Sequence, residues 1–146
     1  MILRQISLAD AAAAARLCGE LGYPVTPAEM AERIRVQMAL PDHVIYVACL
    51  PDRGVAGWID VHITHYLHAP TRAEIAGLVV SSAARGLGIG RQLVAQAERW
   101  AAERGMTQMV VRSQIARERA HQFYLREGYE RTKTSAVFSK TLTPGA

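Results

Sequence analysis

Apolar and polar positions in the first part of the chain follow a strand pattern and then two helical patterns. Residues 2–6 form a short apolar run typical of a strand. Ser7 and Asp10 stand where capping residues open a helix, and the alanine-rich run behind them predicts one that ends near Gly22. The sequence Thr-Pro-Ala-Glu at 26–29 is a second helix start, with threonine as N-cap and proline at the first helical position. Two helices are therefore expected after the first strand.

Three runs rich in β-forming residues come next, at 44–50, 55–63 and 74–80. The first two are separated by Pro-Asp-Arg-Gly at 51–54, which is turn chemistry for an antiparallel hairpin. Residues 64–72 show neither the strand nor the helix pattern and are expected to form a loop. The hairpin and the third run predict three strands of one sheet.

The last part of the chain returns to helical spacing. Residues 89–104 place apolar side chains on one helix face, namely Ile89, Leu93, Ala97, Trp100 and Ala101. A strand is expected over 108–112 and a helix over 117–127, followed by β-like segments around 130–133 and 136–140. The predicted order is β-α-α-β-β-β-α-β-α-β-β. Without repeats or a linker, the chain is expected to form one domain over residues 1–146.

Three glycines alternate with other residues between the run at 74–80 and the helix at 89–104. The segment reads Arg-Gly-Leu-Gly-Ile-Gly-Arg over 85–91. Glycine lets the backbone turn tightly, so that consecutive N–H groups point at one ligand. The free N–H groups and positive dipole end of the following helix add to the attraction for an anion, as do the two arginines. The segment predicts a site for a diphosphate.

The spacing of the glycines narrows the choice of nucleotide. A dinucleotide fingerprint needs glycine at its first, third and sixth places, but Arg91 takes the sixth place after Gly86 and Gly88. The helix opens with Gly-Arg-Gln, whereas a Walker loop needs Gly-Lys-Ser or Gly-Lys-Thr. The His-Arg-Asp and Asp-Phe-Gly motifs of protein kinases are absent from the sequence. What remains is Arg-x-x-Gly-x-Gly, formed by Arg85, Gly88 and Gly90.

With this motif the chain resembles the GNAT superfamily of acyl-CoA-dependent N-acyltransferases, which carries Arg/Gln-x-x-Gly-x-Gly/Ala between its fourth strand and the next helix. A second block, Ala-His-Gln-Phe-Tyr-Leu-Arg-Glu-Gly-Tyr at 120–129, is similar to the family's Ala-x-x-Phe-Tyr-x-x-x-Gly-Phe/Tyr segment. The resemblance spans roughly residues 3–142. It implies an α/β (α+β) fold with a mixed, mostly antiparallel twisted sheet flanked by helices, in a single GNAT domain.

The resemblance implies an N-acetyltransferase that uses acetyl-CoA as cosubstrate, with direct attack of a primary amine on the thioester. It puts the CoA pyrophosphate on backbone N–H groups of Arg85, Gly86, Leu87, Gly88, Ile89, Gly90 and Arg91. It puts the pantetheine alongside Leu78, Val79 and Val80 of the fourth strand. The alternative is that these glycines only make a tight turn.

Glu74 is the candidate base of the reaction. A lysine-like amine has a pKa of about 10.4, so its proton must be removed by a base or a water relay before it attacks. In several small GNAT enzymes a carboxylate at this place on the fourth strand has that role. The alternative is a strand glutamate that pairs with Arg72 or Arg112.

Tyr124 is the candidate general acid, because the family's tyrosine in this segment stands near the CoA sulfur. A phenol of pKa about 10 is a weaker acid than a thiol of about 8.5, so full proton transfer is uphill by roughly 2 kcal/mol. Tyr124 would instead donate a hydrogen bond to the developing thiolate and transfer its proton late in the reaction. The alternative is a core tyrosine on an amphipathic helix.

Three histidines, His62, His65 and His68, recur at intervals of three residues and raise the question of a metal site. Strand geometry puts the first two on opposite faces, so no metal is predicted. Together with Asp60 and Tyr66 they are expected to line the acceptor pocket or cover an edge of the sheet, where the acid would attract a cationic acceptor.

Charge, hydropathy and cysteine content predict the partners and the cellular compartment of the protein. The 146 residues carry a net charge of +4 without a lysine-rich run, which suits a polyanionic cosubstrate and argues against nucleic acid. No apolar run is long enough to span a membrane and the N-terminus lacks a signal peptide, so the cytoplasm is expected. Cys18 and Cys49 are expected to be reduced thiols.

The acceptor is the least determined part of the prediction. A compact chain favours a small-molecule amine over a protein N-terminus or lysine, and a non-catalytic acyl-CoA-binding module is the alternative from another class. The resemblance also allows a homodimer, because family members often dimerise.

Overall fold

The computed structural model describes residues 1–113 and 117–145. The chain divides into two compact units, Met1–Arg112 and Ser113–Ala146. The first unit holds the whole sheet and the helices packed on it, and the second holds one helix and the segment that follows it. Each unit is described by itself.

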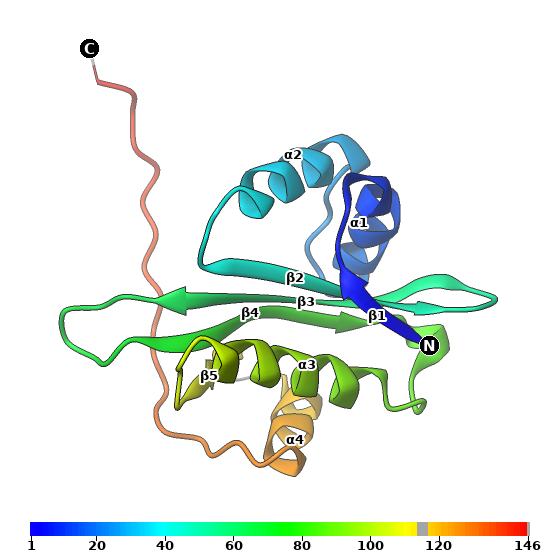
Figure 1. The fold of residues 1–146 in the computed structure, drawn as a ribbon. Coiled ribbons are helices and arrows are strands. Elements are labelled where there is room, and N and C mark those ends of the chain that lie inside the picture. The colour runs from blue at the N-terminus through cyan, green and yellow to red at the C-terminus, as the bar shows by residue number, and fades with distance from the viewer. Residues whose placement is uncertain (114–116, 146) are drawn as a thin grey trace. The chain divides into compact units, whose positions relative to one another are not determined.

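A five-stranded sheet forms the centre of the first unit (Figure 1). Its strands are β1 (Ile2–Gln5), β2 (His43–Leu50), β3 (Gly54–Thr64), β4 (Arg72–Val80) and β5 (Met109–Val111), and they lie in that order across the sheet. The first four are antiparallel to their neighbours, whereas β5 runs parallel to β4. The mixed, mostly antiparallel sheet expected from the sequence is confirmed, with boundaries that shift by only one or two residues.

Helices cover both faces of this sheet (Figure 1). The short 3-10 helix η1 (Leu8–Asp10) leads into α1 (Ala11–Glu20), and α2 (Pro27–Met38) follows. These two α-helices lie on one face, and α3 (Ile89–Glu103) lies on the other. The predicted start of α2 is confirmed in detail, because the Thr26 hydroxyl accepts from the Glu29 N–H and the Glu29 carboxylate accepts from the Thr26 N–H.

The two faces of β3 differ in chemistry because side chains alternate along a strand. Ile59, Val61 and Ile63 are buried, on the face where the backbone of Gly57 approaches the α3 side chains of Ile89 and Leu93. Burying each such aliphatic side chain contributes about 1.5–3 kcal/mol. The alternate positions, Trp58, Asp60 and His62, face α1 and α2, as the hydrogen bond from the Trp58 indole to the Ala14 carbonyl (3.3 Å) shows. Polar side chains therefore gather on the face of the first two helices.

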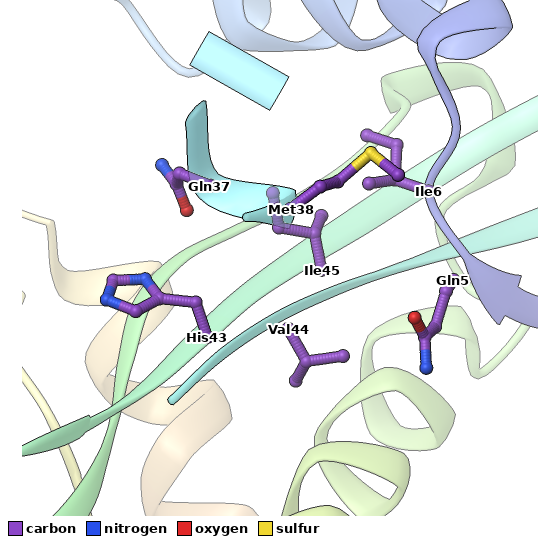
Figure 2. Close-up of a pocket in the computed structure, with 7 residues that line it drawn as sticks. All are labelled: Gln5, Ile6, Gln37, Met38, His43, Val44 and Ile45. Carbon is purple, nitrogen blue, oxygen red and sulfur yellow. The ribbon is translucent and has the colours of Figure 1, made fainter. Parts of the chain in front are cut away.

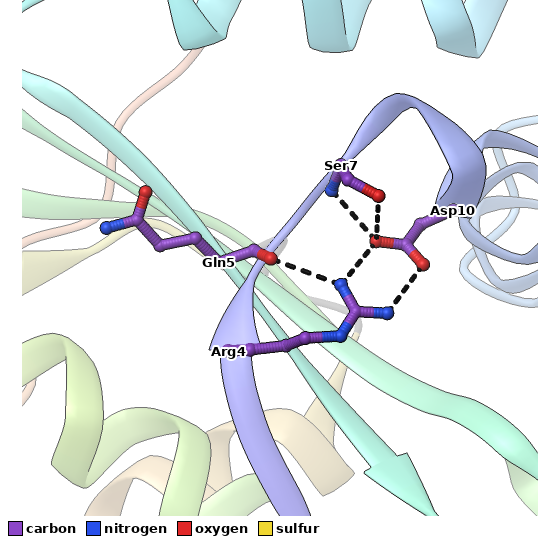
Figure 3. A network of polar contacts seen from close by, with 4 residues as sticks. All are labelled: Arg4, Gln5, Ser7 and Asp10. Atoms are coloured by element: carbon purple, nitrogen blue, oxygen red, sulfur yellow. Dashed lines mark hydrogen bonds and ion pairs between the residues drawn. The ribbon is translucent and has the colours of Figure 1, made fainter.

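An ion pair ties β1 to the start of α1 (Figure 3). Both terminal nitrogens of Arg4 donate to the buried Asp10 carboxylate at 2.8 Å, and the Ser7 N–H donates to the same carboxylate at 2.8 Å. The Arg4 guanidinium lowers the pKa of Asp10, an effect that burial opposes. The predicted capping role of Asp10 is confirmed, and its arginine partner is an addition that the sequence pattern did not indicate.

The second unit contains α4 (Glu118–Arg126), where the sequence predicted a helix over 117–127. The β-like segments expected around 130–133 and 136–140 are wrong, because residues 117–145 form no strand in this structure. Val137 and Phe138 are 92% and 93% exposed. A β-pattern becomes a strand only when a partner satisfies the backbone groups and covers the apolar face, and no strand within 117–145 pairs with these residues.

Candidate active site

The glycine-rich segment forms a turn at the start of α3. Gly86 and Gly88 have φ angles of +84° and +76°, in the left-handed region that L side chains rarely adopt. Gly88 is the N-cap of α3 and brings no capping side chain. A Cβ at either glycine would meet no atom within 4 Å, so both face open space. Gly90 differs from the sequence interpretation, because it lies within the first turn of the helix.

The start of α3 presents donors to that open space. The first intrahelical bond runs from the Gln92 N–H to the Gly88 carbonyl (3.1 Å), so the N–H groups of Ile89 and Gly90 have no acceptor within the helix. The Ile89 side chain is buried, which leaves only its backbone for a ligand. Arg85 is exposed beside the turn, and its charge adds to the positive end of the helix. These groups could hold a phosphate group of a ligand.

Two side chains from distant elements hold the connector between β4 and the turn. This connector contains the 3-10 helix η2 (Ser82–Ala84). The Glu20 carboxylate at the end of α1 accepts from the Ser82 N–H at 2.9 Å, and the Arg53 guanidinium donates to the Ala83 carbonyl at 2.7 Å. The sequence analysis did not find these two contacts. Glu20 lies 62 positions from Ser82, Arg53 lies 30 positions from Ala83, and neither residue is part of a motif.

The strand before the turn leaves one edge open. β4 pairs with β5 only from Ala73 to Ile75. Opposite β3, the register passes from Asp60–Gly77 to Val61–Ile75, so Ala76 is an extra residue, a β-bulge. A bulge bends its strand, which accounts for the early end of the pairing with β5. Over the described residues, the β5-side edge of Leu78, Val79 and Val80 has no strand partner and can bond the amides of an extended ligand.

A row of polar side chains crosses the sheet beside this bulge. His43, His62 and Glu74 are in register on β2, β3 and β4. The Glu74 side chain is only 12% exposed, and both of its oxygens have partners. Oε1 accepts from Arg112 Nε at 2.9 Å and Oε2 lies 3.2 Å from His62 Nε2. The Arg112 pair that the sequence left open is therefore present, and the His62 contact adds to it.

Burial controls the ionisation of the groups around this row. The His62 ring stacks on His43 with centroids 5.0 Å apart. Burial, and the neighbouring His62 ring, lower the pKa of His43. Burial also raises the pKa of Asp60, against the attraction of His62. The Oδ1 atom of Asp60 is buried without a hydrogen-bond partner among the described residues, so this carboxylate is in a costly setting unless it is protonated.

A small pocket opens next to the row, between β1, β2 and the end of α2 (Figure 2). Its polar lining includes Gln37 and His43, and Figure 2 shows both side chains at the same side of it. Gln37 Oε1 and His43 Nδ1 are also buried and without a partner in the part of the chain that the structure describes. The pocket is lined in full by Gln5, Ile6, Gln37, Met38, His43, Val44 and Ile45.

The other two histidines are separated from this row. His65 lies beyond the end of β3 and pairs with Asp42 at 3.2 Å, and the His68 ring contacts the Tyr66 ring. No group of three or more metal-ligating side chains gathers anywhere in residues 1–113 and 117–145. Of the three, only His62 stands beside a candidate catalytic residue.

Tyr124 lies on α4 in the second unit. Its ring makes edge contacts with Phe123 and Tyr129, at centroid distances of 5.2 and 5.8 Å. Burial raises the pKa of the Tyr124 phenol, and the Arg117 charge opposes the shift. The phenol therefore stays protonated at neutral pH and is a weaker acid than an exposed tyrosine, which suits hydrogen-bond donation better than full proton release.

Fold and site together define a class of protein. A mostly antiparallel sheet opens beside an anion-binding turn at a helix start, and a buried carboxylate lies on the same strand that leads into the turn. This arrangement could serve an enzyme that binds a phosphate-bearing cosubstrate. The chain belongs to the Acetyltransferase (GNAT) family, whose model matches residues 11–129. Membership confirms the predicted family, the fold class, and an N-acetyltransferase that uses acetyl-CoA as cosubstrate.

Two curated relatives are small-molecule acetyltransferases. The chain is 40% identical over 94 residues to the aminoalkylphosphonate N-acetyltransferase of Salmonella typhimurium, a match that covers 64% of this chain and 61% of that enzyme. It is 27% identical over 148 residues to the type 1 aminoglycoside N(6')-acetyltransferase of Stenotrophomonas maltophilia, covering 99% of this chain and 95% of the relative. The chain thus spans less than two thirds of the first enzyme and nearly all of the second.

Solved structures share the fold. The aminoglycoside 6'-N-acetyltransferase of Acinetobacter haemolyticus has a TM-score of 0.85 at 20% identity, over 98% of this chain and 100% of that one. An aminoglycoside N-acetyltransferase in complex with CoA has a TM-score of 0.81 at 18% identity, over 97% and 100%. In this protein, no helix within the described ranges has the length and apolar character to cross a membrane.

Proposed function

We propose that the protein transfers the acetyl group of acetyl-CoA to a primary amine of a small polar molecule. The observation that carries the proposal is the uncapped glycine turn at the start of α3, which supplies a diphosphate site where the family binds its donor. The curated relatives support the acceptor class, since their names are those of enzymes acting on aminoalkylphosphonates and aminoglycosides.

The donor site consists of the turn and the open edge of β4. The backbone N–H groups over 85–91 hold the pyrophosphate, and the edge of Leu78, Val79 and Val80 holds the pantetheine amides. The exposed Arg85 adds a charge to the phosphate site. The geometry of Gly86 and Gly88 supports this assignment, because both leave the turn open to a ligand.

The reaction needs a neutral amine and a proton for the sulfur. Glu74 is the carboxylate that promotes loss of the amine's proton, and its burial beside the bulge of β4 supports that role. The amine then attacks the thioester carbon, the C–S bond breaks, and the thiolate becomes a thiol. Tyr124 is the hydrogen-bond donor to the departing thiolate. A partly buried, protonated phenol supports this role.

The proposal also includes the domain organisation, the location and the assembly of the enzyme. One functional domain over residues 1–146 is supported by a family match that runs from 11 to 129 and so extends from the first compact unit into the second. The cytoplasm stays the predicted location, a homodimer stays the suggested assembly, and no role in nucleic-acid binding is proposed.

The proposed function is tested by thiol release from acetyl-CoA against a panel of amines. The panel contains aminoalkylphosphonates, aminoglycosides, polyamines and amino acids, together with peptides that offer an N-terminus or a lysine. We expect release with at least one small amine, confirmed by mass gain of one acetyl group. Release with the peptides alone would indicate a protein acetyltransferase. Tight acetyl-CoA binding without release for any amine would indicate a non-catalytic module.

A further inference from the structure

A short contact joins His62 to Glu74. His62 Nε2 lies 3.2 Å from Glu74 Oε2, which is ion-pair distance when the imidazole is protonated. The carboxylate therefore stands where it stabilises a proton that the ring takes up.

His62 is the more accessible of the two residues in this contact. Its side chain is 22% exposed, against 12% for that of Glu74. His43, stacked against it, has its own Nδ1 fully buried. Glu74 is less accessible than His62, and each of its oxygens already has a nitrogen partner from Arg112 or His62. A proton arriving from a bound amine therefore meets His62 before it meets Glu74.

We propose that the His62 imidazole takes the proton from the amine acceptor and that Glu74 acts through His62, as its positioning residue. The proposal rests on the proposed function and refines the role of Glu74 in it. The ammonium N–H bond breaks as an imidazole N–H bond forms, and the neutral amine attacks the thioester carbon. The C–S bond breaks, the second amine proton goes to the thiolate, and the imidazolium returns its proton to solvent.

Charges on three strands and beyond β5 act on this ring. Glu74 on β4 is the carboxylate in contact with the ring, and His43 on β2 is the neighbouring base. Asp60 on β3 is also near, but burial raises its pKa, so it brings less negative charge. Arg112, which follows β5, offsets part of the Glu74 charge through its hydrogen bond. The side chain from α2 that borders the row, Gln37, is uncharged. Glu74 is thus the group that stabilises the charge His62 acquires when it takes the proton.

The test compares His62→Gln with a matched control, His65→Gln. The glutamine amide keeps a donor for the Glu74 carboxylate but has no basic nitrogen, and His65 forms a histidine–carboxylate pair of the same length, 3.2 Å, outside the row. We expect kcat for the amine to fall about 100-fold or more in His62→Gln, the usual worth of a general base. The rise of kcat/KM with pH should flatten, while the KM for acetyl-CoA stays unchanged. His65→Gln should behave as wild type.

A second variant keeps the test informative if His62→Gln does not fold. His62→Ala leaves space for added imidazole, which should restore part of the rate at constant acetyl-CoA affinity. Full activity and an unchanged pH profile in His62→Gln, with a loss only in Glu74→Gln, would overturn the proposal and make Glu74 the direct base. Failure of the wild-type protein to release thiol with any amine would instead overturn the proposed function itself.

Discussion

At the scale of single residues, the backbone conformation of Gly88 and the surroundings of Glu74 and Tyr124 carry most of the chemistry. The sequence named all three, but it left each with two interpretations. The structure shows that Glu74 takes part in a salt bridge with Arg112. Partial burial raises the pKa of the Tyr124 phenol, so the phenol is protonated at neutral pH.

Replacing Gly88 by alanine should weaken the donor site. The matched control is Gly105→Ala, because Gly105 has nearly the same φ, +79° against +76°, and equally open surroundings. Both variants should lose about 1–2 kcal/mol of stability to the left-handed conformation. Only Gly88→Ala should raise the KM for acetyl-CoA, by about tenfold if one charge-assisted hydrogen bond is lost. Equal KM values in the two variants would place the pyrophosphate elsewhere.

Tyr124→Phe should lower kcat by about 10- to 1000-fold with little change in acetyl-CoA affinity, since it removes a hydrogen-bond donor that acts on the developing thiolate. Because burial raises the pKa of Tyr124, the phenol stays protonated up to its ordinary value of 10.0 and beyond. The rate should therefore show no fall from phenol ionisation below about pH 10. Tyr129→Phe, which alters the neighbouring ring, is the control, and a wild-type kcat in Tyr124→Phe would remove the assignment.

At the scale of elements, the donor site depends on how the connector between β4 and α3 is held. The helices and strands themselves follow from local patterns, and the capping box of α2 is predictable from four consecutive residues. The hydrogen bonds from Glu20 and Arg53 to the connector join elements far apart in sequence. No local pattern predicts such a contact.

Removing the Glu20 side chain should loosen this connector. Glu20→Ala leaves the Ser82 N–H without its acceptor, and a net loss of about 0.5–1.5 kcal/mol would raise the KM for acetyl-CoA roughly 2- to 10-fold with kcat nearly unchanged. Glu20→Gln retains an acceptor oxygen and should recover most of the affinity. Equal KM values for wild type and Glu20→Ala, measured by steady-state kinetics, would show that the connector is held without Glu20.

At the scale of the whole molecule, the Arg4–Asp10 pair links the edge strand β1 to the start of α1, the first helix on one face of the sheet. The native pKa of Asp10 lies below its ordinary value of 3.8, so the unfolded chain binds more protons than the folded one in this range. Stability from this group is complete above pH 3.8 and is lost as the pH falls through the depressed native pKa. The free energy of unfolding should therefore fall at acid pH, in part because this contribution from Asp10 is lost.

Asp10→Asn should lower the free energy of unfolding by about 1–3 kcal/mol at neutral pH, because a buried charge-assisted network is lost. The difference from wild type should shrink as the pH falls below 3.8 and through the depressed native pKa of Asp10, where the wild-type carboxylate is itself protonated. The control is Glu32→Gln, which breaks the exposed Arg35–Glu32 pair and should change stability by less than about 1 kcal/mol. Urea unfolding at several pH values measures both, and a pH-independent difference would contradict this account.

Much of the fold and part of the site could be predicted without coordinates. Strand and helix boundaries up to Val111 lie within one or two residues of the expected ones, because periodicity reports directly which side chains face a core. The prediction failed over 130–133 and 136–140, since a strand also needs a partner and pattern alone does not provide one.

The sequence by itself determined the donor, because a phosphate-binding turn depends on residues adjacent in the chain whose backbone angles only glycine adopts readily. Only the tertiary structure decided that Glu74 contacts both His62 and Arg112. These residues meet through the pairing register of neighbouring strands, which long-range packing sets and local sequence patterns do not encode. The proposed role of His62 as proton acceptor follows from that register.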